Sequence, residues 1–138
     1  MPKVLILVVE DQAELAELYA SNFKSQGFEV DIAHDGHEGF EKMKSERPSL
    51  VLMDIIMPGL SGLEAVELAK HEPSTKDIPI IILTNLPDSV EVQNAMRLGA
   101  ADCIVKADFT PLQVVEKAKK FLDPPAEPKG PNRRYLSS

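Results

Sequence analysis

Apolar residues gather in five short runs along the chain, and a longer segment of different spacing follows each run. The runs cover residues 4–9, 29–33, 50–53, 80–83 and 104–105. Short runs rich in Val, Ile and Leu are typical of β-strands. The second run alternates apolar and polar residues, so we expect its strand near an edge of the sheet and the central strands buried on both faces.

After each run, apolar residues recur every three to four positions, which is the spacing of an amphipathic helix. The expected buried stripes are Leu15, Leu18, Tyr19 and Phe23; Phe40 and Met43; Leu63, Val66 and Ala69; Val92, Ala95 and Met96; and Val115, Ala118 and Leu122. Three helix starts show an N-cap residue with an acid or amide three positions later. These pairs are Ser61 with Glu64, Asp88 with Glu91, and Thr110 with Gln113.

Alternation of strand and helix predicts an α/β fold, because crossover helices join parallel strands and cover both faces of the sheet. We expect a doubly wound, flavodoxin-like (βα)5 domain over residues 1–122 with a five-stranded parallel sheet. The strand order 2-1-3-4-5 is inferred from this fold type and not from spacing. Four of the eleven prolines fall within residues 124–131, so residues 123–138 are predicted to form a tail or linker.

Composition and charge fit one domain of this kind. The chain has 138 residues, of which 43% are hydrophobic and 27% charged. Its formal net charge of -7 argues against nonspecific binding to nucleic acid or to an anionic membrane, since both need an excess of Lys and Arg. The single cysteine, Cys103, cannot form an internal disulfide, and neither a signal peptide nor a long apolar segment is visible. We therefore expect a cytoplasmic protein.

Residues that carry chemistry stand at the ends of four predicted strands. Glu10 and Asp11 follow the first strand, Asp54 the third, Thr84 the fourth and Lys106 the fifth. In an open parallel sheet these carboxyl ends lie at one edge, where ligands bind. With the order 2-1-3-4-5, the three acids would lie in one pocket.

Three carboxylates about 5 Å apart would repel by roughly 3 kcal/mol per pair at an effective dielectric of 20. A hard cation that takes oxygen ligands would offset this repulsion, and Mg²⁺ is expected because it keeps open positions. Such a site lets a phosphoryl group approach an anionic nucleophile, for which Asp54 is the candidate. Lys106 and the Thr84 hydroxyl would then contact the phosphoryl oxygens.

The segments around these residues resemble the receiver domain of two-component response regulators over about residues 3–122. "VVED" at 8–11 is similar to the acidic pair of that family, and "MDIIMPGLSG" at 53–62 to its phosphoacceptor motif. "LTN" at 83–85 occupies the Thr/Ser segment, and "GAADCIVKA" at 99–107 resembles the stretch that leads to the family lysine.

The resemblance implies that a histidine kinase or a histidine phosphotransfer protein phosphorylates Asp54. The implied Mg²⁺ ligands are Glu10, Asp11, Asp54 and the backbone carbonyl of Ile56. Thr84 and Lys106 would bind the phosphoryl group and switch the affinity for a downstream protein target. The chain would act as a switch and not as an enzyme, either as a monomer or as a phosphorylation-dependent dimer.

Three positions depart from the family pattern. Cys103 stands where many members carry a Tyr or Phe that rotates inward on activation, so aromatic coupling is not expected to operate. Asn85 replaces the small residue that often follows the Thr, which is expected to alter access to the phosphoryl group. Ala107 stands where a proline in a cis peptide is common, so that bend is expected to be missing or made differently.

Other functions stay open from the residues alone. A phosphatase of the haloacid dehalogenase type also uses an Asp nucleophile and Mg²⁺, but it places a second Asp two residues later, where this chain has Ile56. A flavodoxin-type protein would need hydroxyl groups where "EDQAEL" follows the first strand. A degenerate receiver would bind partners without phosphorylation. A stand-alone receiver is favoured over a fragment cut after a linker, because no new periodic segment starts in the tail.

Overall fold

All five predicted apolar runs form β-strands in the computed structural model, which describes residues 4–56 and 61–122. The strands are β1 (Leu5–Val9), β2 (Glu29–Ala33), β3 (Leu50–Asp54), β4 (Ile80–Thr84) and β5 (Asp102–Val105). Strand β5 begins two residues before the apolar run, because Asp102 and Cys103 also pair with β4. The predicted tail 123–138 and residue Met57 lie outside the described residues.

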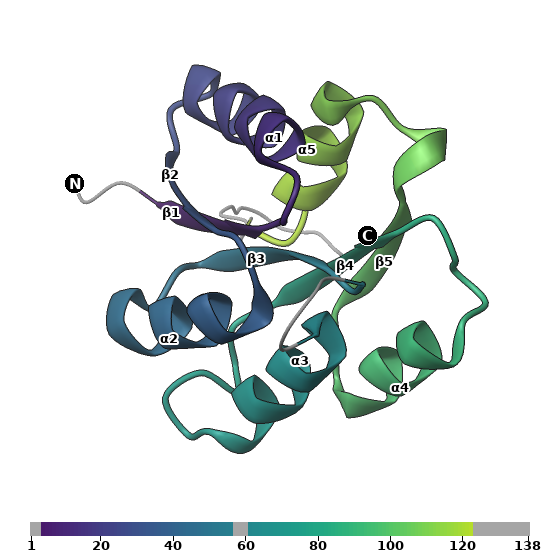
Figure 1. Cartoon of the computed structure of the whole chain (residues 1–138). Coiled ribbons are helices and arrows are strands. Elements are labelled where there is room, and N and C mark those ends of the chain that lie inside the picture. Colours follow the sequence, from purple (N-terminus) through teal and green to yellow (C-terminus); the bar gives the residue numbers. More distant parts are fainter. Residues whose placement is uncertain (1–3, 57–60, 123–138) are drawn as a thin grey trace, which may run out of the picture.

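Helices cover both faces of the sheet, as Figure 1 shows. They are α1 (Ala13–Ser25), α2 (Gly36–Glu46), α3 (Gly62–His71), α4 (Val90–Leu98) and α5 (Pro111–Lys119), with a short 3-10 helix η1 (Lys106–Asp108). Helices α1 and α5 lie on one face, and α2, α3 and α4 lie on the other. The alternating doubly wound arrangement is therefore confirmed.

The sheet has the order β2-β1-β3-β4-β5 with every pair parallel, which confirms the predicted order. Strand β2 is at an edge and only partly buried, whereas β3 and β4 are buried along their whole length. The last register pairs join Val9 to Met53, Asp54 to Leu83, and Thr84 to Val105. The carboxyl ends of the four adjacent strands β1, β3, β4 and β5 therefore lie at one edge of the sheet, within two residues of one another in register.

Each face of the sheet contributes to a separate hydrophobic core. One core packs apolar side chains of β1, β3 and β4 against α2, α3 and α4, and the other packs their opposite faces against α1 and α5. Full burial of one large apolar side chain is worth about 1.5–3 kcal/mol, so these layers fix the strands in place. Two stripe residues were wrongly predicted as core: Leu18 is 51% exposed and Met96 is 39% exposed, because each lies at the solvent border of its helix.

Side-chain caps fix where several helices begin. The predicted capping boxes that start with Ser61 and Thr110 are confirmed at α3 and α5. The prediction of Asp88 as the cap of α4 was wrong, because this helix begins one residue later. Ser89 is its N-cap, and the Ser89 hydroxyl accepts a hydrogen bond from the backbone N–H of Val92 at 3.2 Å.

The three histidines, His34, His37 and His71, are exposed at the surface, while Met53 is fully buried. Among the residues that the structure describes, no helix combines the length and the apolar character that a membrane span needs.

Candidate functional site

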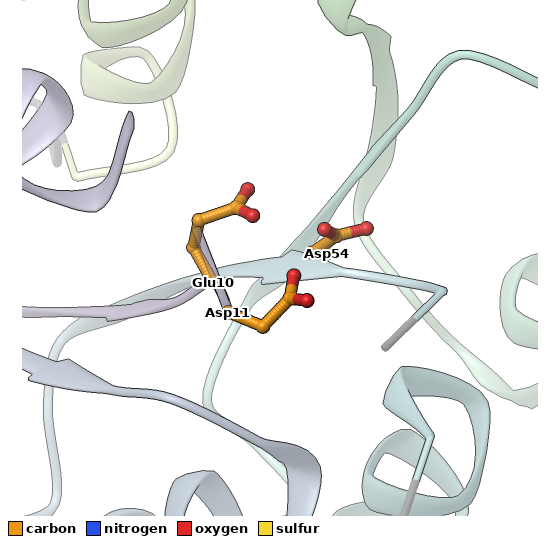
Figure 2. Close-up of side chains that lie close together, drawn as sticks. All are labelled: Glu10, Asp11 and Asp54. Atoms are coloured by element: carbon orange, nitrogen blue, oxygen red, sulfur yellow. The ribbon is translucent and has the colours of Figure 1, made fainter. Parts of the chain in front are cut away.

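Carboxylates at the ends of β1 and β3 form a cluster, which Figure 2 shows. Glu10 and Asp11 directly follow β1, and Asp54 is the last residue of β3. One carboxylate oxygen from each side chain lies within 4.8 Å of the other two. Glu10 and Asp54 are buried, whereas Asp11 is exposed. The neighbouring ends of β1 and β3 thus bring together the three acids that the sequence singled out.

The start of α3 holds the backbone of Asp54 from the side of the loop that follows β3. Gly62, the first residue of this helix, is buried. A Cβ atom at position 62 would overlap the carbonyl oxygen of Asp54 and lie 2.7 Å from Ile55 Cα. A side chain of any size is therefore excluded, and glycine allows the helix to pack directly on the end of β3.

Lys106, the first residue after β5, reaches across the edge of the sheet to two of the acids. Its Nζ lies 2.9 Å from Glu10 Oε1 and 2.9 Å from Asp54 Oδ2. Burial alone would lower the pKa of Lys106, but the hydrogen bonds to Asp54 and Glu10 and their negative charges together outweigh it. The pKa of Lys106 is therefore raised, and the ammonium group stays charged.

Glu10 is the most strongly perturbed member of the cluster, with no exposed surface. Burial, the largest cause, raises the pKa of Glu10 to about 7. The hydrogen bond from Lys106 opposes this rise, and the negative charge of Asp54 adds to it. The backbone N–H of Gln12 also donates to Glu10 Oε2 at 3.2 Å. Glu10 therefore loses its proton close to neutral pH in the absence of a further cation.

The donor set of the cluster fits a hard divalent cation. All three side chains offer oxygen atoms, which are the ligands that Mg²⁺ and Ca²⁺ prefer. When the three carboxylates are ionised, one lysine cannot neutralise them, so charge favours a cation at this place. Asp54 Oδ1 accepts a hydrogen bond from the backbone N–H of Ile56 at 3.1 Å, which places the next residue of the loop beside the carboxylate.

Thr84 ends β4 and is almost completely buried, with 2% of its surface exposed. Its hydroxyl oxygen accepts a hydrogen bond from the backbone N–H of Leu86 at 2.9 Å. The hydroxyl is therefore engaged with its own loop, and among the described residues its bond is not to Asp54 or Lys106. Its predicted contact with a phosphoryl group stays a prediction.

The departures from the family pattern can be located. Cys103 is half-buried and packs against the core under α4. The described residues contain no cis peptide bond, and η1 makes the bend at Ala107. The backbone N–H of Ala107 donates to Asn85 Oδ1 at 2.8 Å, a bond that a proline could not make.

Tyr19 is a neighbour of the cluster that the sequence pattern placed in the core alone. It is 2% exposed, and burial raises its pKa while the charge of Lys106 acts against that rise. Tyr19 lines a pocket of about 210 Å³ together with Gln12, Asn85 and Lys106. Helical spacing indicates only that Tyr19 faces the sheet, because the distance from its side chain to the carboxyl edge depends on the register of α1.

The fold and the site define a doubly wound α/β protein with an acidic cluster and a lysine at the carboxyl edge of its sheet. The family model for the response regulator receiver domain matches the sequence over residues 6–119. The chain therefore belongs to this family.

Known relatives agree with this assignment. The chain is 33% identical over 126 residues to the DNA-binding response regulator MtrA of Mycolicibacterium paratuberculosis, covering 88% of this chain and 54% of the relative. It is 34% identical over 122 residues to the phosphate regulon transcriptional regulatory protein PhoB of Rhizobium meliloti, with coverage of 88% and 52%. The chain thus spans about half the length of these curated relatives.

Solved structures show the same fold. The chemotaxis protein CheY4 of Vibrio cholerae superposes with a TM-score of 0.80 at 26% identity, over 88% of this chain and 100% of that chain. A receiver domain protein from Methanospirillum hungatei superposes with a TM-score of 0.79 at 28% identity, over 88% of this chain and 94% of that chain.

Proposed function

We propose that Asp54 accepts a phosphoryl group in a Mg²⁺-dependent reaction and that the modified chain switches its affinity for a protein target. The observation that carries this proposal is the contact of Lys106 with both Glu10 and Asp54, with Asp11 beside them. A buried carboxylate with a fixed cationic partner and nearby oxygen ligands is suited to receive an anionic group.

Each residue of the cluster has a separate role in the proposal. Glu10, Asp11, Asp54 and the backbone carbonyl of Ile56 would hold Mg²⁺. The bound cation supplies positive charge that reduces the repulsion between an anionic donor and the anionic carboxylate. Lys106 pairs with the acceptor carboxylate at 2.9 Å and then contacts a phosphoryl oxygen. The Thr84 hydroxyl contacts another phosphoryl oxygen after it leaves the N–H of Leu86.

The proposed reaction forms one bond and breaks one. An Asp54 carboxylate oxygen attacks phosphorus and forms an acyl phosphate, while the P–N bond of a phosphohistidine breaks. The imidazole nitrogen keeps the electron pair of the broken bond and takes a proton from solvent. A histidine kinase or a histidine phosphotransfer protein supplies this donor in the cell, and acetyl phosphate supplies it in vitro through cleavage of a P–O bond.

The chain is proposed to act as a stoichiometric acceptor and not as a turnover phosphatase. Support comes from position 56, where the isoleucine cannot serve as the second acid of a phosphatase of the haloacid dehalogenase type. Residues 1–122 are proposed as the receiver unit, with residues 123–138 as a tail or linker. A steady-state assay with phosphate esters should show no turnover beyond one phosphoryl group per chain.

The proposed target surface is formed by α4, β5 and α5. Val90 is 68% exposed on this side, and Gln93 and Arg97 are exposed on the same helix. The Nζ of Lys117 lies 5.1 Å from the centroid of the Phe109 ring, which joins α5 to the segment that follows η1. Contacts of a phosphoryl group with Thr84 and Lys106 would shift the loops that border this surface.

Mass spectrometry of the intact protein with acetyl phosphate and Mg²⁺ tests the chemistry. We expect one phosphoryl group per chain in the wild type, none in Asp54→Asn, and an unchanged yield in the control Asp88→Asn, which alters an exposed acid in the loop before α4. An acid-stable, base-labile mass gain in Asp54→Asn would contradict the acceptor assignment. Light scattering on the same samples shows whether phosphorylation converts monomers into dimers.

A further inference from the structure

Two positions at which the sequence departs from its family are the two ends of one hydrogen bond. The backbone N–H of Ala107 donates to Asn85 Oδ1 at 2.8 Å. Position 107 can act as a donor only because it is not proline. Position 85 can act as an acceptor because its side chain carries a carbonyl oxygen, which a small aliphatic side chain lacks.

This bond extends the sheet beyond its last backbone pair. Strands β4 and β5 end with Thr84 opposite Val105. Asn85 is the next residue on the β4 side, and its side-chain oxygen receives the N–H of the second residue after β5. The side chain thus adds a rung to the ladder of β4 and β5 and joins the segment that contains Thr84 to the turn that contains Lys106.

The rung lies between two residues of the proposed phosphoryl site. On one side, the Thr84 hydroxyl is held by the N–H of Leu86, so the start of this loop is compact. On the other side, Lys106 begins η1 and directs its Nζ to Glu10 and Asp54. The amide of Asn85 therefore connects the loop after β4 directly to the backbone of the lysine turn.

We propose that Asn85 is a positioning residue, which holds Lys106 in line with Asp54 through the N–H of Ala107 and moves this turn when Thr84 shifts. The inference rests on the proposed function, since it assigns Asn85 a role in the same reaction. The hydrogen bond is exposed to solvent, so it contributes little to the stability of the whole fold. Its effect is on the position of the turn.

The experiment compares Asn85→Ala, Asn85→Asp and the control Leu86→Ala with the wild type. Asn85→Ala removes the acceptor, Asn85→Asp keeps an acceptor oxygen, and Leu86→Ala shortens a neighbouring side chain that is 58% exposed. Amide hydrogen exchange at Ala107 measures the bond itself. We expect about tenfold faster exchange in Asn85→Ala, wild-type exchange in the other two variants, and no change at amides within β4.

Two further measurements test positioning. The ¹⁵N resonance of Lys106 Nζ reports its contacts without any donor, and it should shift in Asn85→Ala and return in Asn85→Asp. The rate constant for phosphorylation by acetyl phosphate at saturating Mg²⁺ should fall at least threefold in Asn85→Ala, with no fall in Leu86→Ala.

The possible failures can be told apart. Unchanged Ala107 exchange or an unchanged Lys106 resonance in Asn85→Ala would overturn the inference while leaving the proposed function intact. An unchanged phosphorylation rate in that variant would also overturn it. A wild-type chain that gains no phosphoryl group would overturn the proposed function and the kinetic role of Asn85 with it.

Discussion

Replacing Lys106 with methionine should destabilise the protein by an amount that grows with pH. The change removes the ammonium group that lies 2.9 Å from both Glu10 Oε1 and Asp54 Oδ2, and it keeps most of the aliphatic stem. Loss of one partner from a buried ion pair costs about 3–5 kcal/mol when the other charge stays in place. In this site Glu10 limits the cost, because its pKa is already about 7 and it can take up a proton.

The sign of the pH dependence follows from Glu10. At pH 6 this carboxyl is mostly protonated in both proteins, and only Asp54 loses its partner, so the expected loss is about 1–3 kcal/mol. The variant lacks the hydrogen bond and the charge by which Lys106 lowers the pKa of Glu10, so this pKa rises further.

A carboxyl whose pKa is higher in the folded state holds more protons there than in the unfolded state. The free energy of unfolding therefore falls as pH rises from the pKa of the unfolded state to the higher pKa of the folded state. Between pH 7 and the new pKa of Glu10, the variant should lose about 1.4 kcal/mol per pH unit relative to the wild type.

Urea unfolding followed by circular dichroism in EDTA at pH 6, 7 and 8 measures these free energies. The matched control is Lys119→Met, which removes a lysine whose Nζ lies 3.6 Å from Glu116 Oε1 in an exposed pair. This control should change the free energy of unfolding by less than about 0.5 kcal/mol at every pH. An equal loss for Lys106→Met at pH 6 and pH 8 would refute the reasoning.

Three other outcomes are expected. Gly62→Ala should lower the free energy of unfolding by about 3 kcal/mol or more, because the new Cβ would overlap the backbone of Asp54. A thermal melt like that of the wild type would contradict this expectation. Calorimetry should show roughly tenfold weaker Mg²⁺ binding at pH 6 than at pH 8, because Glu10, with a pKa of about 7, must lose its proton to bind the cation. An affinity that does not change with pH would mean that Glu10 is not a ligand. Ser89→Ala should cost about 1 kcal/mol in urea unfolding and Asp88→Ala much less, and equal losses would argue against Ser89 as the cap.

The sequence pattern predicted the architecture because the central strands are continuous apolar runs between polar segments. Leu50–Asp54 and Ile80–Thr84 are buried along their whole length, and such strands differ plainly from the stripes of a helix. Parallel pairing then places their ends together. The meeting of Glu10, Asp11 and Asp54 follows from that pairing once β1 and β3 are neighbours, an order that was inferred from the fold type.

Contacts between side chains of separate loops could not be read from the sequence. The spacing predicts that Lys106 lies near the acids, but its equal distances to Glu10 and Asp54 depend on the path of η1, which has no periodic signal. The bond between Asn85 and Ala107 depends on that path as well. The cap of α4 was misplaced because Asp88 and Ser89 are both good N-cap residues, and only packing decides between them.

The close contact of Gly62 with the backbone of Asp54 has a consequence for signalling. The end of β3 is fixed on one side by α3 and on the other by the bond from the N–H of Ile55 to the carbonyl of Leu83, at 3.2 Å. If Asp54 is phosphorylated as proposed, we expect α3 to keep its position and the loops after β4 and β5 to move. Under this proposal, a protein that binds the outer surface of α3 would bind both states equally well, whereas a protein that distinguishes the states would contact α4, β5 or α5.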